Sequence, residues 1–272
     1  MSLHSYFPLR SSIVTWTFQL LDQYNLGWEI GTIAMSYIDR FMVARQGLAS
    51  SDVMGVNLAA LCSLQLAVKL HAPNSPNKSK ILLALLNSEL STEMILKGEL
   101  ELLRTLSWKL HQPTAKSFIV QLMELINQKL PGLASHISTK DIVNVASYFA
   151  KHAVYSYNLA TTKPSLVAFA SLFNAIDHLS SIGGSKTYEC YHVPLQDLMS
   201  LFPSLLVSDP DQLDSTRCLL WKFARLQGGR VAKSPPGLNF KKRSGASFPR
   251  VQDGRVVKSP PSININKISR AA

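Results

Sequence analysis

The sequence predicts an all-α protein of two tandem five-helix units followed by a basic tail. Apolar residues recur at i, i+3 and i+4 up to about Gln227, and the alternating pattern of strands is scarce. Hydrophobic residues make up 46% of the 272 positions, which is enough to build a core. The tail after Gln227 contains a single leucine, so we expect the folded part to end there.

The first unit is expected to span residues 1–112, with five helices. Its first helix carries an apolar stripe from Ile13 to Tyr24, and Asn25-Leu26-Gly27 breaks the pattern. Further helices are expected at residues 29–43, 53–70, 81–87 and 94–106. The third is apolar nearly all round, which is typical of a helix surrounded by others. The fifth follows the capping residues Ser91-Thr92-Glu93, and its buried side is predicted to be Leu96, Leu100, Leu103 and Leu106.

The second unit is expected to span residues 113–227 and to begin with Pro113 in the first turn of a helix. Five helices are predicted, at residues 114–128, 139–157, 164–178, 193–202 and 209–226. Residues 228–272 combine few apolar side chains with high charge, so we expect a disordered tail. Within it a short motif repeats, as GRVAKSPPG from Gly229 and GRVVKSPPS from Gly254.

The net charge of +11 is distributed unevenly along the chain. Residues 228–272 hold ten basic residues and one acid, a net charge of +9, which leaves +2 for residues 1–227. A near-neutral body argues against direct nucleic-acid binding by the folded part. The start MSLHSYFPLR lacks a secretory pattern, and the apolar stretch at residues 53–68 is too short to span a bilayer, so no membrane partner is expected.

No chemistry-bearing motif is present. There is no Gly-rich phosphate loop, and the three cysteines are too few and too dispersed for a disulfide framework or a paired-cysteine zinc site. Cys190 and His192 lie two residues apart, a spacing for which a structural role is favoured over a metal site. We therefore expect neither a catalytic site nor a metal or other cofactor.

Specific strings within the helical pattern carry a resemblance to a known family. They are RSSIVTW from Arg10, YIDRF from Tyr37, LAVK from Leu66 and ELELLRTLSWKLHQPT from Glu99. Together they resemble the N-terminal box of cyclins. The string PSLVAFASLFNAI from Pro164 is similar to the central helix of the C-terminal cyclin fold, so the resemblance covers roughly residues 8–226.

This resemblance implies a regulatory subunit that binds and activates a cyclin-dependent serine/threonine protein kinase in cell-cycle control. It places Arg10 and Asp39 in an ion pair between the first two helices. It also places Lys69 and Glu99 against the kinase, with an apolar contact formed by Leu66, Leu70, Leu102 and Leu106. Kinase substrates or inhibitors are further possible partners.

Two departures from the cyclin pattern stand out. Lys69 is followed by Leu70, His71 and Ala72, where cyclins commonly have two acidic residues. A substrate-docking groove would involve Leu9, Ile13, Trp16 and Asn57. In that groove Ser12 is polar where an apolar residue is usual, and Asn57 replaces a common Gln, which argues against docking there.

The tail offers proline-directed phosphorylation sites at Ser234 and Ser259, and Lys241-Lys242-Arg243 has the composition of a nuclear import signal. We therefore expect the protein in the nucleus and cytoplasm. Two rival functions remain open. A cyclin-fold transcription factor would favour a basic body and a zinc ribbon, and a cyclin-like scaffold would bind partners without activating a kinase.

Overall fold

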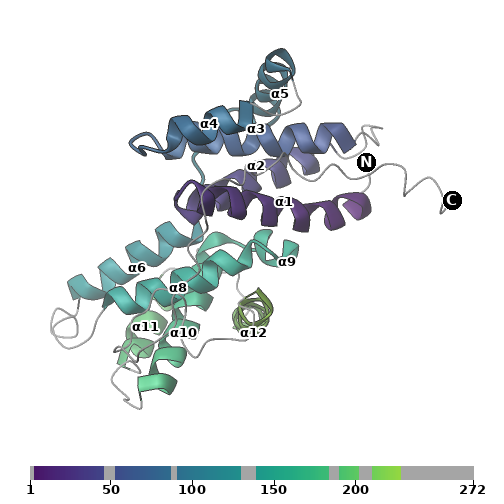
Figure 1. The fold of residues 1–272 in the computed structure, drawn as a ribbon. Coiled ribbons are helices and arrows are strands. Elements are labelled where there is room, and N and C mark those ends of the chain that lie inside the picture. The colour runs from purple at the N-terminus through teal and green to yellow at the C-terminus, as the bar shows by residue number, and fades with distance from the viewer. Residues whose placement is uncertain are drawn as a thin grey trace. The chain divides into compact units, whose positions relative to one another are not determined.

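The structure, a computed structural model, describes residues 3–45, 53–86, 91–129, 139–183, 190–201 and 210–227 (Figure 1). Within these ranges the regular elements are helices and no strand occurs, so the all-α prediction is confirmed. The tail from residue 228 onward, with Ser234 and Ser259, lies outside the described residues. None of the described helices is both long and apolar enough to cross a membrane.

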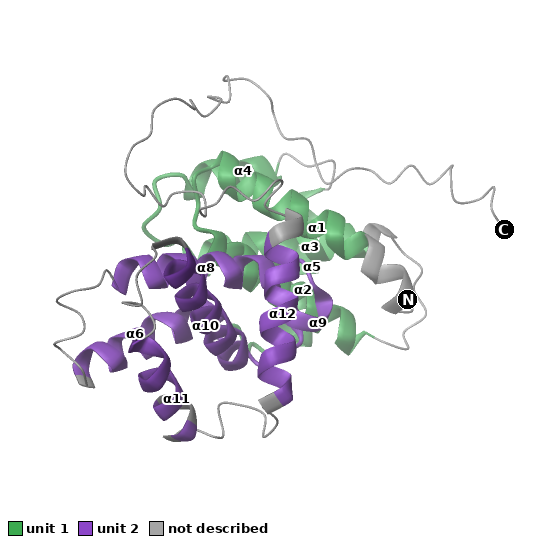
Figure 2. Cartoon of the chain, turned by 90° about the horizontal axis from the view of Figure 1, so that it is seen from below, with its two compact units in different colours: residues 1–110, 247–272 green, residues 111–246 purple. Residues whose placement is uncertain are grey.

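The chain divides into two compact units (Figure 2). Unit 1 contains the described residues up to Leu110, and unit 2 begins at His111. The division therefore falls two residues before the predicted boundary at 112–113.

Unit 1 is built around one buried helix. Its elements are α1 (Leu3–Gln23), α2 (Trp28–Ala44), α3 (Val53–His71), α4 (Lys78–Leu86) and α5 (Thr92–Thr105). Helix α3 packs against α2, α4 and α5 (Figure 1), and every residue from 59 to 68 is buried. This is the environment that its nearly continuous apolar sequence predicts.

The predicted helix boundaries in unit 1 rest on local chemistry that the structure shows. Asn25 adopts a left-handed conformation with φ 51°, which a short polar side chain tolerates, and α1 ends just before it. Ser91 caps α5, because its hydroxyl accepts a hydrogen bond from the Met94 amide at 3.2 Å.

The predicted buried face of α5 is confirmed at Leu106 and wrong at Leu96 and Leu100, while Leu103 is half-buried. Leu96 and Leu100 are 60% and 41% exposed, whereas the inward side consists of Ile95, Glu99, Leu102 and Leu106. Gly98 explains this rotation, since a Cβ there would stand only 3.0 Å from Leu58 Cγ in α3. The helix turns its side-chain-free position toward α3, and this directs the two leucines to solvent.

Unit 2 is also built around one buried helix. Its elements are α6 (Ala115–Lys129), α8 (Thr139–Ala153), α9 (Tyr157–Ala160), α10 (Pro164–Gly183), α11 (His192–Leu201) and α12 (Pro210–Gln227). Helix α10 packs against α6, α8 and α12, and residues 165–176 are all buried. Small side chains at Ala168, Ala170 and Ala175 allow these close approaches.

The helix predicted at residues 139–157 is interrupted. Helix α8 ends at Ala153, and the amides of Val154, Tyr155 and Ser156 each donate to a carbonyl three residues back, a tighter pattern than the α-helix. Ser156 is then extended, with φ −103° and ψ 124°, and stands at the N-cap of α9. The apolar periodicity of the sequence continues through this turn, because Val154 and Leu159 are both buried although the helix is broken between them.

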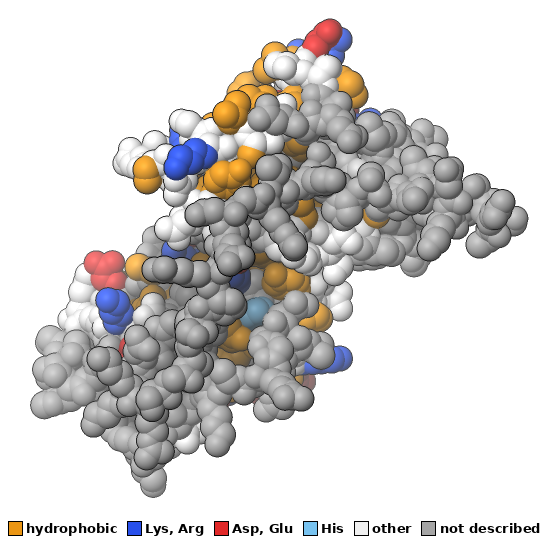
Figure 3. All heavy atoms as spheres, in the orientation of Figure 1, with side chains coloured by type: hydrophobic (Ala, Val, Ile, Leu, Met, Phe, Trp, Pro, Cys, Tyr) orange, Lys and Arg blue, Asp and Glu red, His pale blue; other side chains and the backbone are white. Residues whose placement is uncertain are grey.

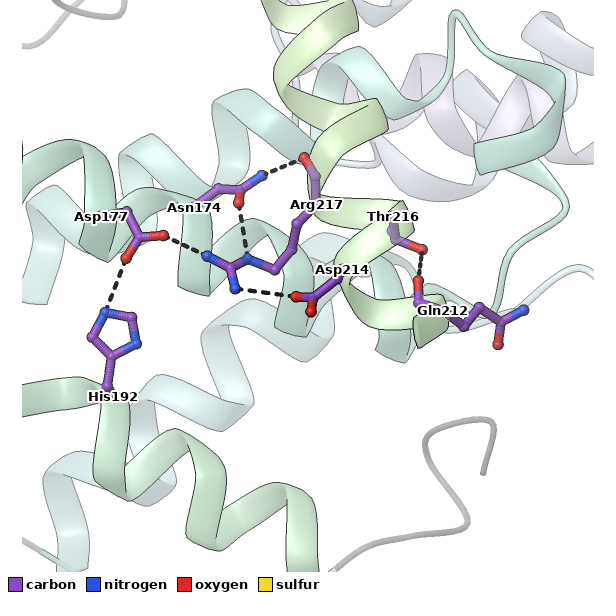
Figure 4. A network of polar contacts seen from close by, with 7 residues as sticks. All are labelled: Asn174, Asp177, His192, Gln212, Asp214, Thr216 and Arg217. Atoms are coloured by element: carbon purple, nitrogen blue, oxygen red, sulfur yellow. Dashed lines mark hydrogen bonds and ion pairs between the residues drawn. The ribbon is translucent and has the colours of Figure 1, made fainter. Parts of the chain in front are cut away.

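A polar network joins three helices of unit 2 (Figure 4). Arg217 in α12 pairs with Asp177 in α10 and donates from Nε to Asn174 Oδ1 at 3.2 Å. His192 Nε2, at the start of α11, lies 3.0 Å from Asp177 Oδ1. His192 therefore has a structural partner, and no described group of three potential ligands is arranged to hold a metal ion.

Candidate functional site

Lys69 and Glu99 form an ion pair at the surface of unit 1. Lys69 lies near the end of α3 and Glu99 in the middle of α5, and Lys69 Nζ is 2.8 Å from both carboxylate oxygens of Glu99. The Lys69 side chain is 36% exposed and the Glu99 side chain 12%. An ammonium group has three donors, so one remains for an acceptor outside unit 1.

The helix end that carries Lys69 is itself fixed. Lys78 in α4 donates from Nζ to the Lys69 carbonyl at 3.0 Å. A cation at a helix C-terminus satisfies an otherwise unpaired carbonyl and opposes the negative end of the helix dipole. The backbone that positions the Lys69–Glu99 pair is therefore stabilised independently of the pair.

Helix α5 ends in a turn that displays an aromatic ring. The Ser107 amide donates to the Arg104 carbonyl at 2.9 Å, and the Trp108 amide donates to the Leu103 carbonyl at 3.0 Å. These two bonds define a Schellman motif, in which the side chains at the positions of Trp108 and Leu103 commonly touch. Trp108 is 64% exposed, which is unusual for so large an apolar ring.

An apolar surface borders the ion pair. Leu96 precedes Glu99 by three residues and Leu103 follows it by four, so both neighbour Glu99 on the helix. Leu70, next to Lys69, is 37% exposed. We define the α3–α5 surface as the Lys69–Glu99 pair with Leu70, Leu96, Leu100, Leu103 and Trp108. Figure 3 shows hydrophobic side chains on the face of unit 1 where α4 and α5 lie.

The family model of the cyclin N-terminal domain matches residues 4–111, which include all of the α3–α5 surface. Over this range the chain is similar to the N-terminal domain of cyclins. It is 29% identical over 164 residues to the G1/S-specific cyclin-D of Caenorhabditis elegans, covering 60% of this chain and 37% of that protein. It is 26% identical over 167 residues to cyclin-B1-1 of Oryza sativa, covering 61% of this chain and 35% of that protein. The match thus spans little more than a third of these relatives.

A solved structure is also similar to this chain. The CAK complex from Chaetomium thermophilum bound to ATP-gamma-S contains a chain that matches with a TM-score of 0.49 at 14% identity. The match covers 90% of this chain and 83% of that chain.

Three of the four leucines predicted to contact a kinase lie in the core of unit 1. Leu66, Leu102 and Leu106 are 5%, 0% and 3% exposed, so their side chains pack inside unit 1 rather than presenting a surface. The α3–α5 interface buries them because α5 turns Gly98 and Ile95 toward α3. Of that predicted set, Leu70 alone is exposed.

The predicted substrate groove is not displayed as an open apolar surface. Ile13 and Trp16 are 4% and 5% exposed, while Leu9 and Asn57 are half-buried. The first two belong to the buried side of α1, which packs against α2. Arg10, on the same helix, pairs with Asp39 of α2.

Sequence reasoning missed Leu96, Leu100 and Trp108 as exposed residues and Leu103 as a half-buried one. The signal for the three leucines was Gly98, because a glycine within an amphipathic helix often marks close helix contact. Trp108 had no such signal, since the Schellman position before it is occupied by Ser107 instead of the usual glycine.

Proposed function

We propose that this chain is a cyclin, which binds a cyclin-dependent protein kinase through the α3–α5 surface and stabilises its active conformation, in cell-cycle control. The observation that carries the proposal is the Lys69–Glu99 pair, held at the edge of an exposed apolar surface within a cyclin N-terminal domain. The role is regulatory, and no residue of the chain is assigned to catalysis. The name of the Caenorhabditis relative, which refers to G1/S, supports the cell-cycle setting.

The composition of this surface suits a protein partner. Interfaces commonly combine a few large anchors with placed polar groups, and tryptophan is enriched among the residues that dominate binding. Here Trp108 and Leu100 are exposed anchors, while Lys69 has a donor left for a backbone carbonyl of the partner. Burial of the apolar groups would supply affinity, and the ion pair would set the register.

Activation follows from preferential binding to one kinase conformation. A protein kinase is active when a glutamate of its C-helix pairs with the strand lysine that holds ATP phosphates. A cyclin that contacts the C-helix only in this inward position shifts the population toward it. The size of the shift equals the difference in affinity for the two conformations, so binding alone does not guarantee activation.

The residues after Lys69 belong to unit 1 itself. His71 Nε2 lies 3.1 Å from the Tyr37 hydroxyl, and Ala72 is 7% exposed. Neither supplies the carboxylates that cyclins commonly place here. A scaffold that binds a kinase without activating it is therefore the outcome that an activity assay must distinguish.

The test measures affinity and histone phosphorylation for the full chain mixed with purified cyclin-dependent kinases that lack their own cyclins. We expect Lys69→Ala and Glu99→Ala each to weaken binding about thirtyfold, which corresponds to about 2 kcal/mol at a hot spot. Stimulation of histone phosphorylation should fall in parallel.

The matched controls are Lys97→Ala and Glu93→Ala, because these residues form an i, i+4 pair on the same helix with both side chains 76% exposed. They should change affinity less than twofold. The double variant Lys69→Glu with Glu99→Lys restores an internal pair with reversed charges. We expect it to remain defective, whereas full recovery of binding, or wild-type binding by the single alanine variants, would overturn the proposed contact.

We also propose that the protein occupies nucleus and cytoplasm, on the basis of Lys241-Lys242-Arg243. This cluster and the two predicted phosphorylation sites, Ser234 and Ser259, lie outside the described residues. Imaging the tagged full chain beside a variant with these three residues changed to alanine tests the proposal. Equal nuclear signal in both would contradict a role for the cluster.

A further inference from the structure

The turn that displays Trp108 is strained. Ser107 and Trp108 both have left-handed backbones, with φ 51° and 59°, and neither is glycine. In this conformation the Cβ of a non-glycine residue crowds the following carbonyl oxygen, so each residue is less stable here than in a right-handed conformation. Strain of this kind persists only where surrounding contacts determine the backbone. Contacts from the surrounding helices therefore hold this turn in its conformation.

Two side chains of α2 bind the backbone directly after Trp108. Arg40 Nη1 donates to the Lys109 carbonyl at 2.9 Å, and the Tyr37 hydroxyl donates to the Leu110 carbonyl at 2.8 Å. The Tyr37 ring is 1% exposed, so its hydroxyl is fixed in place by the core. Burial also raises the pKa of Tyr37 to about 12, and the hydroxyl keeps its proton at physiological pH.

His71 completes the arrangement from α3. Its Nε2 lies 3.1 Å from the Tyr37 oxygen. Because the Tyr37 proton is directed at the Leu110 carbonyl, the oxygen accepts from His71, and Nε2 carries the proton. The Lys109 and Leu110 carbonyls are thus both bonded to α2, and the Leu110 carbonyl is connected through Tyr37 and His71 to the end of α3.

We propose that Tyr37 and Arg40 are positioning residues that hold the turn at residues 106–110, so that Trp108 is presented to the kinase in its bound conformation. The inference rests on the proposed function and adds to it the two residues that hold the Trp108 anchor in place. An anchor fixed before binding loses less conformational entropy on association, which increases affinity without any additional contact. Tyr37 and Arg40 do not themselves form part of the α3–α5 surface.

The first experiment measures amide hydrogen exchange in the full chain, because the Trp108 amide is bonded to the Leu103 carbonyl and reports on the turn. We expect Tyr37→Phe and Arg40→Ala each to accelerate exchange at Trp108 about tenfold, the effect of losing one hydrogen bond. Arg45→Ala is the matched control, because Arg45, just beyond the end of α2, binds the Glu101 side chain instead of the turn. Unchanged exchange at Trp108 in both variants would overturn the proposal.

The second experiment is a double-mutant cycle on affinity, using a kinase that the wild-type chain binds. Tyr37→Phe should weaken binding about fivefold in the wild-type background and less than twofold in the Trp108→Ala background, because it acts through Trp108. Equal losses in both backgrounds would show that Tyr37 acts on the fold in general, which would overturn the positioning role. Normal kinase binding by Tyr37→Phe would do the same.

The two experiments separate this inference from the proposed function. If the wild-type chain binds no cyclin-dependent kinase, the proposed function is overturned, and so is the part of this inference that names a kinase as the partner of Trp108. The exchange measurement then still decides whether Tyr37 and Arg40 hold the turn. If the kinase binds and the cycle shows no coupling, the proposed function stands and the positioning role is overturned.

Discussion

Arg10 in α1 and Asp39 in α2 are joined by two hydrogen bonds, from Nε at 2.8 Å and from Nη2 at 2.9 Å. The Arg10 side chain is 3% exposed and the Asp39 side chain 14%. The planar guanidinium matches both carboxylate oxygens, a geometry that a lysine ammonium cannot reproduce. The pair therefore fixes the relative rotation of two helices that are connected by only a few residues.

We expect Arg10→Ala to lower the free energy of unfolding of unit 1 by about 3 kcal/mol, because it leaves a largely buried carboxylate without its partner. Urea unfolding followed by tryptophan fluorescence measures this, since Trp16, Trp28 and Trp108 lie in unit 1. Arg45→Ala is the control. It removes a pair whose side chains are 36% and 54% exposed, so its effect should stay below about 0.5 kcal/mol. Equal effects of the two variants would contradict the prediction.

Acid should destabilise unit 2 through His152. This side chain is 7% exposed, and burial, with a smaller effect of Lys151, lowers its pKa from 6.5 to about 4. The folded state therefore binds fewer protons than the unfolded state between these values. The stability that depends on a neutral His152 is present above pH 6.5 and is lost as the pH falls toward 4.

We expect a loss of about 2 kcal/mol between pH 7 and pH 5, measured by urea unfolding of the full chain with circular dichroism. His152→Phe keeps an aromatic ring beside Tyr148 and Tyr155 and cannot titrate, so its stability should depend less on pH. Some dependence will remain, because burial also lowers the pKa of His178. An unchanged slope in His152→Phe would contradict the assignment.

Gly31 is predicted to tolerate no side chain. A Cβ at this position would stand 2.8 Å from Phe18 Cε1 and 2.9 Å from Leu21 Cδ1, and both of those side chains are buried. We expect Gly31→Ala to destabilise unit 1 by about 1–2 kcal/mol, because overpacking exceeds the gain in helix propensity. Gly27→Ser, at the open N-cap of α2, should instead stabilise slightly. Thermal unfolding compares the two, and stabilisation by Gly31→Ala would refute the prediction.

The helices were largely predictable from the sequence, because periodicity, capping residues and breakers act over a few residues. The rotation of α5 was not. Leu96, Leu100 and Leu103 form one apolar stripe, and Ile95, Leu102 and Leu106 form another. Choosing between them requires knowledge of how α5 approaches α3, which depends on Gly98 and its partner Leu58 in another helix.

The candidate site was predictable to a different extent for charged and apolar residues. A charge such as Lys69 within a buried helix stands out in the sequence, so the pair could be named beforehand. Leucine has the same chemistry in a core and in an interface. Leu66 and Leu102 could therefore be recognised as buried only after the packing of α3 against α5 was known.

The exposed leucines of α5 allow partner binding to be separated from folding. Leu100 is 41% exposed, so Leu100→Glu should change the free energy of unfolding by less than about 0.5 kcal/mol. On the α3–α5 surface the same change would place a charge in a desolvated contact and should weaken kinase affinity at least tenfold. Val120→Glu is the matched control, since Val120 is 44% exposed on α6 of unit 2. If both variants retain wild-type affinity in a direct binding assay, the kinase does not contact this face of α5.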